Sequence, residues 1–159
     1  MIKSIIFFFI SIAILSTNLN GQDMDNDKLH GIIYTLSDHT EGQKGNWQFV
    51  IDSTFFICLT DQMHNRMRII SPIDKIENIS DERIKKCLEA NFHTALDARY
   101  AISDGYLWSA FIHPLKELTK EQVISAISQV YSCAKTFGTY YSSGTLNFPT
   151  REERDAGKN

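Results

Sequence analysis

The sequence has little cysteine and proline, and it lacks any long run of basic residues. Its 159 residues include three cysteines and three prolines, and 19 acidic residues outnumber 16 lysines and arginines. Nucleic-acid-binding proteins usually carry a basic patch, so the net charge of −3 makes nucleic acid a poor partner. No second long apolar segment follows the first 21 residues, which predicts no stable membrane insertion for the rest of the chain.

The usual motifs of metal and catalytic sites are also missing. The five histidines form no HxH or HExxH spacing, the cysteines form no CxxC pair, and there is no GxSxG. Residues 23–27 resemble the start of a calcium loop, but Lys28 stands where that loop needs glycine and Tyr34 where it needs glutamate. We therefore expect a solvated acidic stretch there, and no catalytic residue, metal or cofactor.

Cys58, Cys87 and Cys133 each lie in an apolar pattern. Burial of this kind raises the pKa of a thiol and lowers its reactivity. An odd number of cysteines leaves at least one free or paired between chains. Three buried free thiols and a single disulfide between two of them are both compatible with the sequence.

The first 21 residues have the layout of a secretory signal peptide. Residues 1–3 form a short basic start, residues 5–15 form an 11-residue apolar core, and residues 16–21 are polar and end in a small residue. The core is shorter than the roughly 20 residues that span a bilayer, although an uncleaved anchor is the alternative. The layout predicts a periplasmic or secreted protein that begins at Gln22.

The remaining chain is long enough for one domain with its own core. We expect a single domain over residues 22–141 and a flexible polar tail over residues 142–159, which hold almost no apolar residue. Loss of the first 21 residues removes one lysine and no acid, leaving 15 basic against 19 acidic residues and a net charge of −4.

Three stretches have the periodicity of amphipathic helices. The first covers residues 26–37, and the second covers residues 81–94 after the expected N-cap Ser80. The third begins at Thr119, which forms a capping-box pattern with Gln122. The expected buried stripe of the second helix is Ile84, Cys87, Leu88 and Phe92.

Five strands are expected between and after these helices. They are residues 47–51, 54–60 and 66–70, and the two arms of a hairpin within residues 97–113. Residues 39–46 are expected to form a polar loop and residues 71–78, with Pro72, a connection. The order α-β-β-β-α-β-β-α predicts an α+β fold with an antiparallel five-stranded sheet.

The second hairpin has two apolar faces, which one layer of helices cannot both cover. A two-residue turn at Asp104-Gly105 fixes its register. The more uniformly apolar set, expected to face the helices, includes Ile102, Leu107 and Phe111. The other set is expected to form an outer face that binds a partner or a second copy, with Arg99 diagonal to Trp108; its candidate residues are Arg99, Tyr106, Trp108 and Ala110.

The stretch from Leu88 to Phe137 resembles the bacterial sensory-transduction-regulator (YbjN-like) family, which has a type III secretion chaperone-like fold. The residues that carry the resemblance are Asn91-Phe92, Ala98-Arg99-Tyr100, Asp104-Gly105, Pro114-Leu115 and Leu118–Val123. The resemblance implies a small non-enzymatic fold that often forms dimers and holds protein segments. The export signal is a departure from this family.

These observations favour an exported, non-enzymatic protein-binding module that acts through a homodimer or a protein partner on the sheet face. The alternative is a small-ligand carrier or an enzyme with a pocket between sheet and helices. Helix one or the tail could also cover the outer face within a single chain.

Overall fold

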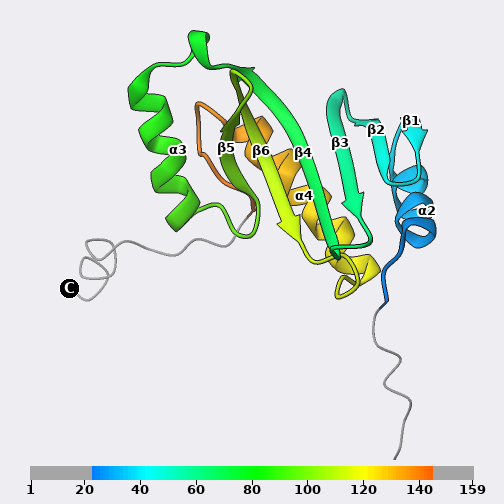
Figure 1. The fold of residues 1–159 in the computed structure, drawn as a ribbon. Helices are drawn as coiled ribbons and strands as arrows, with labels where there is room; N and C mark the ends of the chain where they lie inside the picture. Colours follow the sequence, from blue (N-terminus) through cyan, green and yellow to red (C-terminus); the bar gives the residue numbers. More distant parts are fainter. Residues whose placement is uncertain (1–22, 145–159) are drawn as a thin grey trace, which may run out of the picture.

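The computed structural model describes residues 23–144 (Figure 1). The expected signal peptide therefore lies outside the described residues. The elements, in chain order, are α2 (Asn26–Leu36), β1 (His39–Gln43), β2 (Asn46–Ile51), β3 (Thr54–Asp61), β4 (Arg66–Lys75), the 3-10 turn η1 (Ile76–Asn78), α3 (Asp81–His93), β5 (Arg99–Ser103), β6 (Tyr106–His113) and α4 (Lys120–Thr136).

The strands form one antiparallel sheet in the order β1-β2-β3-β4-β6-β5. The α+β class is as predicted, but the sheet has six strands instead of five. The additional strand is β1, which lies within the expected loop of residues 39–46. Its side chains are mostly exposed and polar, so they give no alternating signal, and pairing with β2 is what makes this segment a strand.

The predicted hairpin turn at Asp104-Gly105 is present with its predicted register, and the two residues between the first two expected strands form a second turn of the same length. Asp52 and Ser53 connect β2 to β3, and Asp104 and Gly105 connect β5 to β6; all four have positive φ. Positive φ at both central residues gives the twist that joins antiparallel strands through a two-residue loop. The turn chemistry therefore sets which side chains share a face of the sheet.

Strand β4 is longer than predicted because it continues through Pro72. Beyond Ile70, β4 pairs with β6 and no longer with β3, and its register shifts between Pro72 and Asp74. A proline without an N–H is tolerated at a bulge or where one edge of the strand has no ladder partner. The expectation that residues 71–78 are only a connection was therefore wrong.

Helices α2 and α4 cover one face of the sheet and enclose the core with it. The fully buried side chains on this inner face include Trp47, Phe49, Phe56, Met67, Ile69 and Leu107. The rings of Phe49 and Phe56 stack at 5.1 Å across β2 and β3. The capping box of Thr119 and Gln122 begins α4, as predicted.

Helix α3 lies beside the edge strand β5 and does not cover the sheet (Figure 1). Its buried residues are Cys87 and Ala90, while Leu88 is 64% and Phe92 is 78% exposed. The predicted stripe was wrong for these last two residues, because a helix at a sheet edge buries only a narrow strip. Ser80 is at the N-cap as predicted, but its side chain makes no capping hydrogen bond.

Residues 141–144 turn back onto the loop before β5. The hydroxyl of Ser143 accepts a hydrogen bond from the backbone N–H of Leu96 at 2.6 Å, and Ser143 is buried. The expected tail began at residue 142; its residues 145–159 lie outside the described residues.

Candidate functional site

The side of the sheet that faces away from α2 and α4 carries a band of apolar side chains. We call this side the outer face. Figure 1 shows α4 passing behind the strands, and among residues 23–144 no helix lies in front of them. The apolar members of the outer face are Val50, Phe55, Ile57, Leu59, Ile70, Pro72, Tyr106, Trp108, Ala110 and Ile112.

The cross-strand registers place these residues in adjoining rows. Ile57 of β3 pairs with Ile70 of β4, which pairs with Ala110 of β6. Pro72 of β4 pairs with Trp108 of β6 in the next row. Side chains opposite one another on neighbouring strands lie close enough for direct contact. The outer face is therefore a continuous apolar surface across three strands.

The four candidate residues from the sequence all belong to this face. Arg99 pairs with Ala110 in the predicted register, and Tyr106 and Trp108 lie one row apart on β6, with ring centroids 6.1 Å apart. The Trp108 indole N–H donates to the backbone carbonyl of Ser103 at 3.0 Å. That bond holds the indole over the β5–β6 hairpin.

The exposure of the outer face is uneven. Ile112 is 60% exposed and Phe55 is 39% exposed, whereas Ala110 is only 8% exposed. The small Ala110 side chain lies between Ile70 and Arg99 in the register, and these larger side chains shield it from solvent. The surface thus has prominent apolar side chains on either side of a low central point.

The register confirms the predicted inner face for all three residues, but one of them is not buried. Leu107 and Phe111 are buried, as predicted, but Ile102 is 56% exposed. Ile102 lies on the edge strand β5, two residues before the Asp104-Gly105 turn. The hairpin register places its side chain on the correct face, but an edge position leaves it partly uncovered.

Sequence reasoning missed the contribution of β4 to the outer face. Ile70, Pro72 and the two arginines Arg66 and Arg68 point outward from this strand, since Met67 and Ile69 between them are buried. The alternation from residue 66 to residue 70 could have revealed this pattern. Pro72 indicated the end of the strand, so the continuation of β4 to Lys75 was not predicted.

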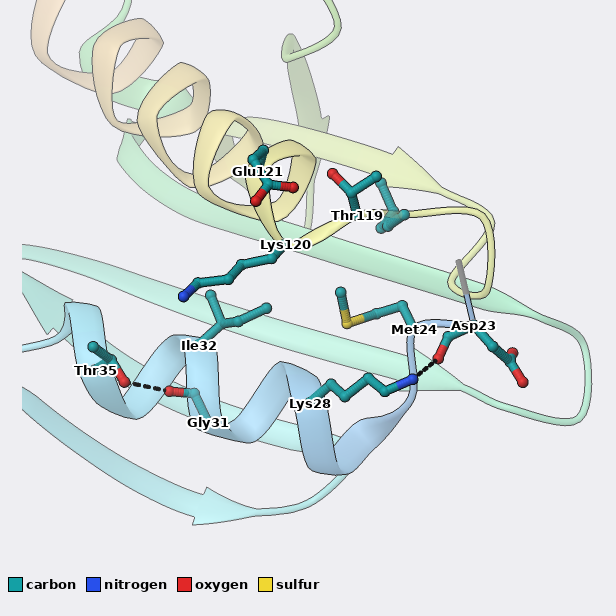
Figure 2. Close-up of a pocket in the computed structure, with 10 residues that line it drawn as sticks. Asp23, Met24, Lys28, Gly31, Ile32, Thr35, Thr119, Lys120 and Glu121 are labelled. Carbon is teal, nitrogen blue, oxygen red and sulfur yellow. Dashed lines mark hydrogen bonds between the residues drawn. The ribbon is translucent and has the colours of Figure 1, made fainter. Parts of the chain in front are cut away.

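A cavity of about 590 Å³ lies between α2 and the start of α4 and does not lie on the outer face. Figure 2 shows Lys120 reaching from α4 toward α2, and Lys28 donating to the backbone carbonyl of Asp23 at 2.6 Å. Ile32 and Met24 supply an apolar part of its lining. Thr119 and Glu121 also line it, and the Thr119 hydroxyl caps α4 by accepting from the backbone N–H of Gln122 at 3.0 Å.

A smaller polar cavity of about 130 Å³ lies between β6 and α4, and Asp97, His113 and Gln129 are among its lining residues. Pockets for small ligands typically measure about 300–1,000 Å³. Its groups are also occupied within the chain: the Gln129 amide oxygen accepts from the backbone N–H groups of Asp97 and Ala98 at 2.9 and 3.2 Å. This cavity therefore suits a few water molecules better than a ligand.

Comparison with known proteins identifies the fold. No family model matches the chain, and no curated protein matches it significantly. The Yersinia pestis type III secretion chaperone SycH, solved in complex with a stable fragment of YscM2, matches with a TM-score of 0.55 at 14% identity, over 71% of this chain and 98% of that chain. The ExsC–ExsE complex matches with a TM-score of 0.55 at 11% identity, over 77% of this chain and 100% of that chain.

The fold is type III secretion chaperone-like. A further match, the HopA1–SchA chaperone–effector complex, has a TM-score of 0.49 at 12% identity, over 64% of this chain and 77% of that chain. At identities of 14% and 11%, the likeness to the SycH and ExsC–ExsE structures establishes the fold and not the activity.

In this chaperone-like fold, Cys58, Cys87 and Cys133 are free and buried. Burial raises the pKa of Cys87 and of Cys133 to about 11 in each case, and it raises that of Cys58 further. Of the two possibilities left open by the sequence, the structure therefore has three buried thiols. None has the lowered pKa of a reactive cysteine.

The acidic stretch at the start of the chaperone-like domain has structural roles. Asp25 caps α2 by accepting from the backbone N–H of Lys28 at 2.8 Å, and Asp27 forms an ion pair with Lys44. Within the described range, no group of three or more His, Cys, Asp or Glu side chains is placed to hold a metal ion. Within the same range, no helix is both long and apolar enough to cross a membrane.

Proposed function

We propose that this protein is an exported, non-enzymatic protein-binding module that uses the outer face of its sheet. The observation that carries the proposal is the apolar band from Phe55 to Ile112, which no helix of residues 23–144 covers. Monomeric proteins seldom expose large contiguous apolar patches, and such patches usually mark interaction surfaces.

The two structural neighbours with TM-scores of 0.55 support a protein-binding role. SycH was solved with a fragment of YscM2, and ExsC was solved with ExsE, so each of these folds is seen together with a second protein. By analogy, we infer that this chain also holds a protein partner or a second copy. The YbjN-like resemblance agrees with that inference and stays a prediction.

We further propose that the protein acts in the periplasm or outside the cell, after cleavage behind Gly21. The layout of residues 1–21 supports this, with its short basic start and 11-residue apolar core. N-terminal sequencing of the protein from an envelope fraction should give Gln22 or a residue within a few positions of it. Recovery of an intact N-terminus from the cytosol would refute export.

Substitution of Trp108 by arginine tests the binding role directly. The arginine places a charge in the middle of the apolar band without altering the buried inner face. We expect Trp108→Arg to abolish capture of the partner from the native envelope, or to convert a dimer into a monomer in light scattering. Lys85→Glu, an exposed charge change on α3, is the control and should leave both unchanged.

If the wild-type protein is a monomer and Trp108→Arg leaves both partner capture and solubility unchanged, the outer face is not the binding surface. The second candidate, a small-ligand carrier or an enzyme, depends on the polar cavity beside His113. Its volume of about 130 Å³ makes it the weaker candidate.

A further inference from the structure

The outer face is positively charged on three of its strands, although the whole chain has a net charge of −3. The outward positions of β4, β5 and β6 carry four cationic side chains and no anionic one. The cationic side chains are Arg66, Arg68, Lys75 and Arg99. The outward positions of these three strands are therefore cationic, whereas the whole chain is anionic.

Two of these cations lie within the apolar band and form no ion pair with a side chain of residues 23–144. Arg68 pairs in the register with Leu59 on one side and Ile112 on the other. Arg99 pairs with Ala110, and its guanidinium donates to the backbone carbonyl of Ala98 at 2.9 Å. Each arginine thus keeps donors that a carboxylate could accept from, beside side chains that an apolar group could contact.

The other two cations are less available. Lys75 forms an ion pair with Glu77 at 3.5 Å. Arg66 lies opposite Asp61 in the register, although the Asp61 carboxylate also holds the His64 ring at 2.6 Å. We therefore take Arg68 and Arg99 as the two recognition points.

The surface beside Arg68 is hollowed. A cavity of about 470 Å³ is lined by Leu59, Ile112 and Arg68, together with Asp61, Arg66 and neighbouring residues of β3 and β4. Apolar walls with an arginine at the rim suit an apolar side chain that has an acidic neighbour. A purely apolar partner would leave the guanidinium without a counter-charge.

We propose that the occupant of the outer face is an extended protein segment that alternates apolar and acidic residues, and not a second copy of this chain. The inference rests on the proposed function and names the chemistry of the partner. In a two-fold dimer the same patch meets itself, which would bring the cations of β4 and β5 toward their own copies. Like charges in an interface disfavour that pairing.

The register also predicts the spacing of the acidic residues. Arg68 pairs with Ile112 and Arg99 pairs with Ala110, so the two arginines are two strands apart and offset by two residues along the strands. With strands about 4.8 Å apart and about 3.4 Å per residue, the distance between them is about 12 Å. Acidic residues four positions apart in an extended segment are about 13 Å apart and point to the same side. The residue midway between them would then face Ala110 and Ile112.

Three synthetic nine-residue peptides test this proposal by fluorescence anisotropy against the purified protein. The first has two glutamates four positions apart with valine at the other central positions. The second replaces both glutamates by lysine, and the third places the two glutamates next to each other. The net negative charge of the protein should favour the lysine peptide non-specifically. Tighter binding of the first peptide would therefore have to come from the arginines of the outer face.

We expect the first peptide to bind at least about tenfold more tightly than either of the others, with an affinity that falls as salt is raised. The double variant Arg68→Glu/Arg99→Glu should lose this preference, and the control Lys85→Glu should keep it. Equal binding of the glutamate and lysine peptides, or an unchanged preference in the double variant, would overturn the inference.

Failure of the charge inference can be told apart from failure of the proposed function. If all three peptides bind equally and Trp108→Arg abolishes their binding, the outer face binds protein without selecting charge. If a concentration-dependent dimer excludes the peptides and dissociates in Trp108→Arg, the occupant is a second copy and this inference is wrong. If no peptide binds and Trp108→Arg changes neither partner capture nor solubility, both proposals are wrong.

Discussion

Asn91 of α3 pairs with the backbone of Tyr100 in β5 through both ends of its side-chain amide. The amide nitrogen donates to the Tyr100 carbonyl at 3.0 Å, and the amide oxygen accepts from the Tyr100 N–H at 2.8 Å. This arrangement imitates a strand partner at the open edge of the sheet. Unpaired edges invite pairing with other chains, so Asn91 both anchors α3 and protects β5.

We predict that Asn91→Ala destabilises the protein by about 1–3 kcal/mol, because two backbone groups lose their partner at once. Urea unfolding should show this loss, and hydrogen exchange at the Tyr100 amide should become faster. Leu88→Ala on the same helix is the control: Leu88 is largely exposed, so its free energy of unfolding should change by about 0.5 kcal/mol or less. Equal effects of the two substitutions would show that the amide pairing contributes nothing specific.

Two adjacent phenylalanines of β3 should separate stability from binding. Phe56 is fully buried on the inner face, and Phe55 lies on the outer face. Phe56→Ala should cost about 3–5 kcal/mol in the free energy of unfolding. Phe55→Ala should cost about 1 kcal/mol or less, and it should weaken partner binding. Denaturant unfolding and the binding assay together check this prediction, and a reversed order of the two stabilities would contradict the face assignment.

The cysteines should be unreactive in the folded protein. With a pKa of about 11, about one thiol in a thousand is ionised at pH 8 for Cys87 and for Cys133. A thiol-specific chromogenic reagent should therefore react slowly with the native protein and promptly with three thiols after denaturation. A count of one thiol in the denatured, unreduced protein would reveal a disulfide and contradict the structure.

Glu117 should titrate below the ordinary pKa of a glutamate. The side-chain amide of Asn65 donates to both carboxylate oxygens of Glu117, at 3.1 and 3.0 Å, and this contact lowers the pKa of Glu117. Because the folded state holds the proton less tightly than the unfolded state, the contribution to stability is present above the ordinary pKa. It is lost as the pH falls through the lowered pKa.

Asn65→Gly should raise the pKa of Glu117 toward its ordinary value in an NMR titration of the carboxyl carbons. Glycine is chosen because Asn65 has a φ of +52°, which an alanine would adopt only with strain. Glu121 is the internal control, since its pKa is lowered by its own backbone and by Thr119. An unchanged Glu117 titration would show that Asn65 is not the cause.

The elements with strong local signals were predictable. The capping box at Thr119, the two-residue turns at Asp52-Ser53 and Asp104-Gly105, and the apolar stripe of α2 each result from interactions among near neighbours in sequence. Those turns also fixed the hairpin registers and placed Tyr106 and Trp108 on one face. Turn chemistry is local, so a sequence can specify it without knowledge of the rest of the fold.

The errors occurred where distant segments decide the structure. Strand β1 is polar and is held by its pairing with β2, and β4 continues through Pro72 because β6 accommodates a bulge. Leu88 and Phe92 follow a helical apolar pattern, yet the edge position of α3 leaves both exposed. Hydrophobic periodicity identifies the side of a helix that could be buried, but the neighbouring elements determine what is covered.

By itself, the sequence determined the α+β class, the hairpin registers and the two-sided apolar character of the sheet, because these depend on side-chain alternation and turn residues close in the chain. Only the tertiary structure decided that β4 places Arg68 beside Ile112, on the same face as Arg99 and Trp108, and that no helix of residues 23–144 covers this face. Strand order brings β4 next to β6 across about 40 residues of chain, and such long-range pairing leaves no local signal in either strand.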